Sequence, residues 1–249
     1  MTTFGSLIVF VFLPFSGIGV FQKLQIEKLW IWFGTGNNQR YIPVHDLVKI
    51  LGPKQTVLPL FHAITGCDQV SFFAGKGKKL CWKAWGRFED LTECLRSISC
   101  CPSKESVISS FDQLQRYVVL LYDRTSLSKN VNACRKEMFS KKGRLPESIP
   151  PTLDALKLHI LRAVYQASYC WAQSLFKEPT LPDPCDWGWT LSGENYETVW
   201  TTIPEASKIC SELVRCGCKQ EKGCRGRCKC VKASLPCTAL CKCGADCER

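Results

Sequence analysis

Residues 216–247 read CGCKQEKGCRGRCKCVKASLPCTALCKCGADC and hold half of the 18 cysteines in the chain. Three C-x-C pairs alternate with single cysteines, and three to six other residues separate each pair from the next cysteine. A segment this short cannot build a sufficient apolar core, so it must be cross-linked by disulfides or by zinc. The candidate ligands are Cys216, Cys218, Cys224, Cys228, Cys230, Cys237, Cys241, Cys243 and Cys247.

The odd number of cysteines favours zinc over disulfides. Intrachain disulfides would leave one of the nine thiols over, whereas thiolates around Zn²⁺ have no parity requirement. Three zinc ions need twelve coordination positions, and nine thiolates supply them if three sulfurs each bridge two ions. That cluster carries a charge of −3, which the net +6 of residues 215–249 offsets. We therefore predict about three zinc ions as cofactors, with a secreted disulfide knot as the alternative.

The order of these cysteine intervals resembles the tesmin-type CXC domain and, more distantly, the nine-cysteine, three-zinc cluster of pre-SET domains. The resemblance covers residues 216–247 and implies zinc binding, often together with DNA binding. Family domains that bind DNA commonly carry two repeats and a Tyr beside the second C-x-C pair. This chain has one repeat, with Arg227 before Cys228. We expect Arg225, Arg227 and Lys229 to contact nucleic acid from this basic tail.

Composition outside the tail is that of a globular protein. The 249 residues are 45% hydrophobic and 22% charged, which is enough apolar surface for a core and excludes wholesale disorder. A formal net charge of +11 favours an acidic partner, most commonly nucleic acid. No apolar run reaches the roughly 20 residues of a membrane-spanning helix, so we expect no membrane partner.

The same features predict the cellular compartment. Zinc thiolates indicate a reducing environment, so we expect a nuclear or cytoplasmic protein, with the nucleus favoured, and not a secreted one. The apolar run at residues 7–13 could be read as part of a signal peptide. However, no Lys or Arg precedes this run and Pro14 follows it directly, which favours a buried β-strand.

Hydrophobic patterning predicts an α+β fold: a mainly α-helical body with a short N-terminal strand pair, plus a small irregular zinc-cluster domain. The expected strands are 27–33 and 40–44. The expected helices are one between residues 43 and 52, then 58–65, 78–85, 107–122 and 152–175, the last with Thr152 as N-cap.

Residues 60–85, LFHAITGCDQVSFFAGKGKKLCWKAW, place a tight glycine turn before a helix. Gly75 and Gly77 allow close backbone approach to a phosphate, and the following helix N-terminus offers amide donors. The positive charge comes from Lys76, Lys78 and Lys79. This arrangement is suited to gripping a nucleic-acid backbone without reading its sequence.

The order Gly66-Cys67-Asp68, then Gly-x-Gly-x-Lys and a helix, resembles the flap-endonuclease and XPG-like nucleases. The longer stretch 27–85 resembles metazoan proteins that join such a region to a C-terminal CXC tail. These resemblances imply a PIN-like domain in which Asp68 is a magnesium ligand. They also imply that Gly75, Gly77 and Lys78 belong to the DNA-gripping hairpin.

One departure separates this chain from those nucleases. They hold two Mg²⁺ with several acidic residues, most of them upstream, and the first 26 residues here contain no Asp or Glu. We therefore expect no nuclease activity from this chain on its own, and magnesium only if a nuclease is active. We divide the chain into a truncated nuclease-like region (1–139), a linker with a long helix and a Trp- and Pro-rich segment (140–206), and a CXC domain (207–249).

Taken together, these features predict a zinc-dependent nucleic-acid-binding protein whose partner is DNA and whose contacts are to the backbone. Two other functions stay open. One is a metal-dependent structure-specific nuclease, which requires acidic residues around Asp68. The other is a protein-interaction module derived from a mobile element, which requires a protein partner instead of a nucleic acid.

Overall fold

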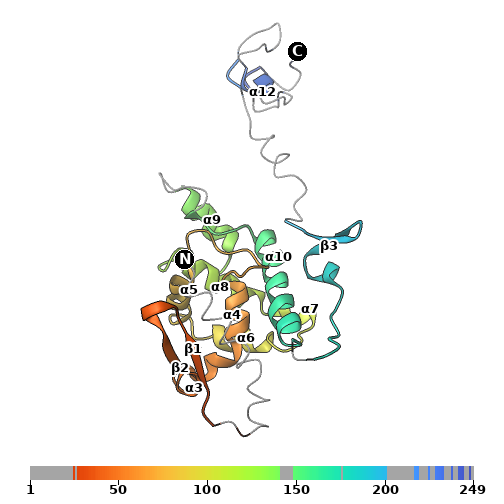
Figure 1. The fold of residues 1–249 in the computed structure, drawn as a ribbon. Helices are drawn as coiled ribbons and strands as arrows, with labels where there is room; N and C mark the ends of the chain where they lie inside the picture. Colours follow the sequence, from red (N-terminus) through yellow and green to blue (C-terminus); the bar gives the residue numbers. More distant parts are fainter. Residues whose placement is uncertain are drawn as a thin grey trace. The chain divides into compact units, whose positions relative to one another are not determined.

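A computed structural model describes residues 25, 27–140, 148–174, 176–200, 216–218, 224, 228–232, 237, 241–243 and 247. The chain divides into two compact units, residues 1–200 and 201–249, and each is treated separately below (Figure 1). The strand expected at residues 7–13 lies outside the described residues. Within the described residues, no helix combines the length and the apolar character needed to cross a bilayer.

The first unit is a mainly helical body with two small antiparallel sheets, and together with the cysteine-rich tail this confirms the expected α+β class. Its strands are β1 (Trp30–Phe33), β2 (Arg40–Pro43), β3 (Trp189–Ser192) and β4 (Asn195–Thr198). Its helices are α3 (Val44–Leu51), α4 (Leu58–Ile64), α5 (Lys78–Trp85), α6 (Leu91–Ser97), α7 (Lys104–Ser109), α8 (Phe111–Tyr122), α9 (Val131–Ser140) and α10 (Leu153–Val164). Shorter 3₁₀ turns lie at Gly36–Asn38, Gly52–Val57 and Pro184–Trp187, and a π-helical segment spans Tyr165–Trp171.

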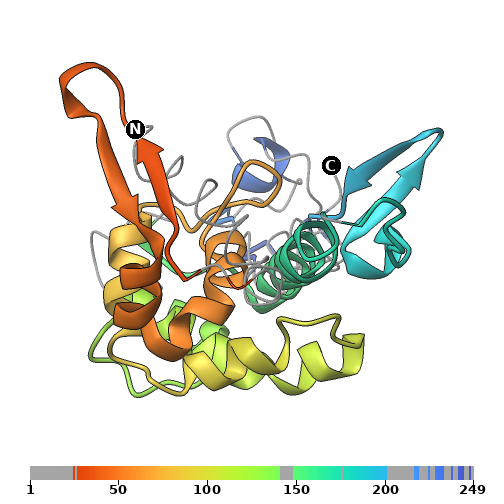
Figure 2. The ribbon, with the colours of Figure 1, turned by 60° about the horizontal axis from the view of Figure 1, so that its bottom comes forward.

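The expected N-terminal strand pair is present as the β1–β2 hairpin, which projects from the body beside α3 (Figure 2). Its register pairs Ile31 with Ile42 and Trp32 with Tyr41. Because side chains alternate across a strand, Ile42 is buried while Trp32 and Tyr41 are exposed and pack ring to ring at 4.6 Å.

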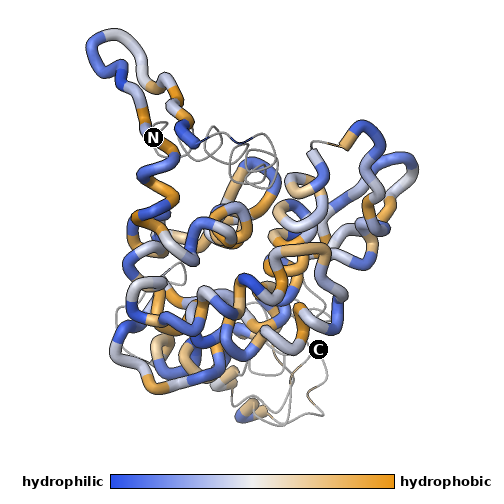
Figure 3. The backbone as a smooth tube through the Cα atoms, turned by 90° about the horizontal axis from the view of Figure 1, so that it is seen from below, coloured by the Kyte–Doolittle hydropathy of each residue, from blue (hydrophilic) through white to orange (hydrophobic). Residues whose placement is uncertain are grey.

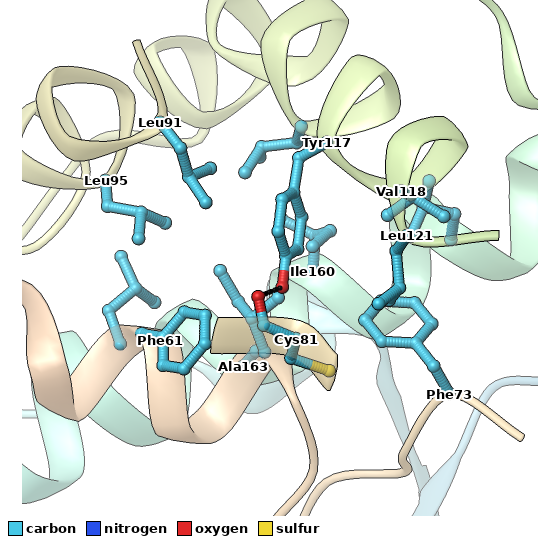
Figure 4. Packing of buried hydrophobic residues seen from close by; sticks show 14 of the residues in the cluster. Phe61, Phe73, Cys81, Leu91, Leu95, Tyr117, Val118, Leu121, Ile160 and Ala163 are labelled. Atoms are coloured by element: carbon cyan, nitrogen blue, oxygen red, sulfur yellow. Dashed lines mark hydrogen bonds between the residues drawn. The ribbon is translucent and has the colours of Figure 1, made fainter. Parts of the chain in front are cut away.

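The core of the first unit lies where α4, α5, α6, α8 and α10 meet (Figure 4). Hydrophobic and hydrophilic residues alternate along these helices, as expected for helices with one buried face (Figure 3). The buried Tyr117 hydroxyl donates to the Cys81 carbonyl at 3.2 Å and so ties α8 to α5. Other side chains in this cluster are Phe61, Phe73, Leu91, Leu95, Val118, Leu121, Ile160 and Ala163.

Two helices expected as continuous are interrupted. The helix expected over 107–122 is split between α7 and α8 at Ser110, whose hydroxyl donates to the Ser106 carbonyl at 3.0 Å. The helix expected over 152–175 begins as predicted, with Thr152 accepting from the Ala155 amide, but turns into the π-helical segment at Tyr165. There the Ser168 hydroxyl donates to the Ile98 carbonyl, a tertiary contact that helical periodicity does not contain.

Gly66 is the point at which the chain leaves the end of α4. Its φ is +102°, a backbone conformation that residues with a side chain rarely adopt. A Cβ at this position would lie 2.5 Å from the Cβ of Phe72. Gly75 also has a positive φ, +67°, but a Cβ at that position would meet nothing within 4 Å. Replacing Gly75 would therefore introduce backbone strain alone, whereas replacing Gly66 would introduce strain together with a steric clash.

We predict that Gly66→Ala lowers the free energy of unfolding of the first unit by about 3 kcal/mol, because strain and overlap with Phe72 add. Gly75→Ala, the matched control, should cost about 1 kcal/mol because it incurs strain alone. Urea unfolding followed by tryptophan fluorescence measures both values, since all eight tryptophans lie in residues 1–200. Equal losses in the two variants would contradict the packing described for Gly66.

Candidate metal centre and basic turn

The described cysteines of the C-terminal unit gather into one compact cluster. Three overlapping groups of four each have all their Sγ atoms within 4.8 Å of one another. The first group is Cys216, Cys224, Cys228 and Cys237; the second is Cys216, Cys230, Cys237 and Cys241; the third is Cys224, Cys237, Cys243 and Cys247. The structure thus brings together eight of the nine cysteines predicted to bind metal, and several sets of them are close enough to hold an ion.

The sulfur separations match coordination of a common ion. The Sγ of Cys216 lies 3.7 Å from that of Cys224, and the Sγ atoms of Cys230 and Cys241 are also 3.7 Å apart. The Sγ atoms of Cys224 and Cys237 are 3.8 Å apart. Four sulfurs at tetrahedral corners around Zn²⁺ are about 3.8 Å apart, given Zn–S distances of about 2.3 Å. Disulfide sulfurs are about 2.05 Å apart, and every described cysteine in the chain is outside a disulfide.

Short stretches of backbone position these sulfurs. The amide of Lys242 donates to the Cys216 carbonyl at 3.1 Å, which joins the first and last C-x-C pairs. Between them, the one-turn helix α12 (Lys229–Lys232) follows Cys228 and contains Cys230. Cys218, the ninth predicted ligand, packs against the cluster but belongs to none of the three groups.

The electrostatics of the cluster call for a cation. Burial raises the pKa of the thiols of Cys224, Cys230 and Cys237. Sulfurs this crowded cannot all ionise unless a positive charge lies beside them. Cys228 is different: a hydrogen bond from the Val231 backbone lowers the pKa of its thiol to about 6. A bound divalent ion reverses the effect of crowding, since it deprotonates the thiols that coordinate it. The donor set is entirely soft sulfur, which suits zinc.

The glycine turn predicted before α5 is present, but Lys78 is held inside the fold. Its Nζ donates to the carbonyls of His62 (2.9 Å) and Gly66 (2.5 Å) and to the Thr65 hydroxyl (2.9 Å). An ammonium has three donors, so all of its hydrogen-bonding capacity is used within the protein. Lys78 therefore closes the C-terminus of α4, where unpaired carbonyls favour a positive charge.

The other predicted basic residues are placed differently. Lys79 is exposed, and Lys76 lies half-buried with its Nζ 4.8 Å from the centre of the Tyr122 ring. Gly75 and Gly77 are both exposed. In the C-terminal unit Lys229 is exposed, whereas Arg225 and Arg227 lie outside the described residues.

Asp68, which the resemblance makes a magnesium ligand, is exposed just beyond the break at Gly66. Among the residues that the structure describes, it belongs to no group of three or more potential metal ligands. The described residues around Asp68 therefore do not include the acidic cluster that the resemblance implies.

Two buried histidines, His62 and His159, support the same end of α4. His62 stacks on Trp171 at 5.7 Å. His159, from α10, contacts the Ile64 carbonyl through Nε2 at 2.8 Å and the Ser71 hydroxyl through Nδ1 at 2.9 Å. Position 159 is far from positions 64 and 71 in the sequence, so no local motif predicts these two hydrogen bonds.

No protein-family model matches this chain, and no curated protein or solved structure matches it either. The chemistry of the two sites therefore rests on the residues themselves.

We predict that Lys78→Met lowers the free energy of unfolding of the first unit by about 2 kcal/mol, because three acceptors at the end of α4 lose a charged donor. Lys79→Met, one residue along and exposed, should change it by less than about 0.5 kcal/mol. Urea unfolding without any ligand measures both. If Lys78→Met were as stable as Lys79→Met, the assignment of Lys78 to the closure of α4 would be wrong.

A second prediction concerns acid. Burial lowers the pKa of His62 to about 3 and that of His159 to about 4, below the ordinary 6.5. Between pH 6.5 and 4 the unfolded chain binds protons that the folded chain does not, so stability falls as the pH falls through this window. Each histidine should cost about 2 kcal/mol on going from pH 7 to pH 5.

The variant His159→Gln isolates one of these contributions. It should show a pH 7 to pH 5 loss smaller by about 2 kcal/mol than the loss of the parent chain, because glutamine does not titrate there. Urea unfolding at the two pH values, followed by tryptophan fluorescence, makes the comparison. An identical pH dependence in both proteins would show that His159 takes up its proton while folded.

Proposed function

We propose that this protein is a zinc-dependent nucleic-acid-binding protein whose C-terminal unit is a three-zinc thiolate cluster. The observation that supports zinc binding is the overlap of the three groups of cysteine sulfurs. Three groups of four offer the twelve positions that three tetrahedral zinc ions require. Zinc bound there supplies the positive charge that holds the thiolates together.

The overlap also supports an assignment of the bridging thiolates. Cys216 and Cys224 each belong to two groups, and Cys237 belongs to all three. These three residues would share their sulfurs between ions, while Cys228, Cys230, Cys241, Cys243 and Cys247 would each serve one. A thiolate bridge joins two ions, so these eight residues supply eleven of the twelve positions if Cys237 bridges two, and Cys218, packed against the groups, would supply the twelfth.

We predict that Cys237→Ser releases more zinc than Cys218→Ser, because Cys237 joins all three groups. Zinc transfer to a chromogenic chelator at neutral pH measures the amount released and its rate. The parent should lose metal slowly, Cys218→Ser should lose about one ion faster, and Cys237→Ser should lose most of its zinc. A Cys237→Ser protein that retains its metal like Cys218→Ser would contradict the bridging arrangement.

The nucleic-acid half of the proposal rests on charge. The chain carries +11, and the net +6 of residues 215–249 exceeds the −3 of a three-zinc, nine-thiolate cluster. Of the residues predicted to contact phosphates, the exposed Lys79 and Lys229 and the half-buried Lys76 are described and lack the internal hydrogen bonds that hold Lys78. Such contacts follow the backbone, so we propose binding to DNA with little sequence preference, in the nucleus.

Fluorescence anisotropy with labelled DNA of two unrelated sequences, at several salt concentrations, tests this half. The double variant Lys76→Ala/Lys79→Ala should weaken binding to both sequences about equally and reduce the salt slope by about 1–2. The control is Lys177→Ala, an exposed lysine of the first unit that lies away from this turn in the sequence. Affinity that does not change with salt would reject backbone binding, and absence of binding to any DNA or RNA at low salt would favour a protein-interaction module.

A further inference from the structure

Cys100 and Cys101 form a second cysteine site, in the first unit and separate from the metal cluster. The two residues are adjacent in the loop between α6 and α7, and both are exposed. Most other cysteines of this unit are buried or half-buried, among them Cys81, Cys94 and Cys134. Cys185 is also exposed but has no cysteine beside it in the chain.

Tertiary hydrogen bonds hold this loop against the π-helical segment. The Ser168 hydroxyl donates to the Ile98 carbonyl at 2.9 Å, and the Tyr169 hydroxyl donates to the Pro102 carbonyl at 2.5 Å. Between these anchors the Cys101 thiol donates to the Ser168 carbonyl at 3.7 Å. The two thiols are therefore presented by a fixed loop.

The two thiols differ in their surroundings. Partial burial and the neighbouring Cys100 thiol raise the pKa of Cys101. Cys101 therefore keeps its proton, which it shares with the Ser168 carbonyl. Because the Cys101 thiol is held by its hydrogen bond to the Ser168 carbonyl, we assign the attack on the oxidant to Cys100.

We propose that Cys100 and Cys101 are a site of reversible oxidation by hydroperoxides, which converts the two thiols into a disulfide between neighbours. The Cys100 thiolate attacks the peroxide ROOH, breaks its O–O bond and becomes a sulfenic acid, while ROH leaves with a proton from water. The Cys101 thiol then displaces the sulfenic hydroxyl, so that the S–S bond forms and water leaves. Two thiols lose two electrons and two protons, and one peroxide is reduced to ROH and water.

A disulfide between neighbours is suited to a reversible modification. Consecutive Cα atoms are about 3.8 Å apart, whereas disulfides usually join Cα atoms about 4.4–6.8 Å apart. The resulting strain makes the bond easy to reduce, as is typical of labile and regulatory disulfides. Oxidation also removes the Cys101 thiol proton, so the loop loses its hydrogen bond to Ser168 of the π-helical segment.

The test uses the full zinc-loaded chain treated with one equivalent of hydrogen peroxide, then alkylated and cleaved with trypsin. The tryptic peptide SISCCPSK, residues 97–104, contains these two cysteines and no other. We expect the mass of this peptide to fall by two hydrogens and its cysteines to remain unalkylated. Reduction with dithiothreitol should restore both thiols. The peptide with Cys185 should stay fully alkylated, and it serves as the internal control.

Two variants separate the roles of the sulfurs. In Cys101→Ser the sulfenic acid of Cys100 has no partner, so dimedone should trap it, whereas Cys100→Ser should yield at least about tenfold less dimedone adduct. The proposal is overturned if Cys185 is oxidised as fast as the pair. It is also overturned if the parent peptide carries sulfinic acid or links two chains instead of closing on itself. These readouts do not depend on whether the tail binds zinc or the protein binds DNA.

Discussion

Sulfur atoms held 3.3–3.8 Å apart are the constraint on which the C-terminal unit depends. Thiols this close and this buried resist ionisation, and their mutual packing offers little of the apolar area that stabilises an ordinary core. A divalent ion converts the same crowding into an attraction, because each thiolate then faces a positive charge. The net charge of +6 in residues 215–249 offsets the negative charge that such a cluster would keep.

In the first unit, side chains from several elements meet at the end of α4 and are held there by hydrogen bonds. The end of α4 is closed by the Lys78 ammonium, braced by His159 from α10 and released into the next loop by Gly66. These residues come from three separate parts of the sequence. Gly66 and Lys78, two residues of the motif that resembles the nucleases, therefore have structural roles in this fold.

Local signals in the sequence were sufficient for some elements and not for others. The β1–β2 hairpin, the helix over Lys78–Trp85 and the Thr152 cap were predictable, because alternation, helical periodicity and capping chemistry act over a few residues. The break at Ser110 and the π-helical segment after Val164 were not predictable, because neither the Ser110 hydroxyl bond to the Ser106 carbonyl nor the Ser168 bond to the distant Ile98 carbonyl follows from helical periodicity. The cysteine pattern predicted a metal site, but only the folded arrangement shows that Cys237 joins three groups and that Cys218 joins none. In the same way, the glycine turn, the charge and the resemblance to nucleases marked Lys78 as a nucleic-acid contact, and its three internal acceptors are visible only in the fold.

The most direct test of this account is the mass of the intact chain, purified under reducing conditions without chelators and measured by native mass spectrometry. The account predicts a mass excess of three zinc ions, with the tail cysteines unavailable to alkylating reagents until the metal is removed. A metal-free chain whose tail is ordered, or one whose tail cysteines are joined by disulfides, would contradict it.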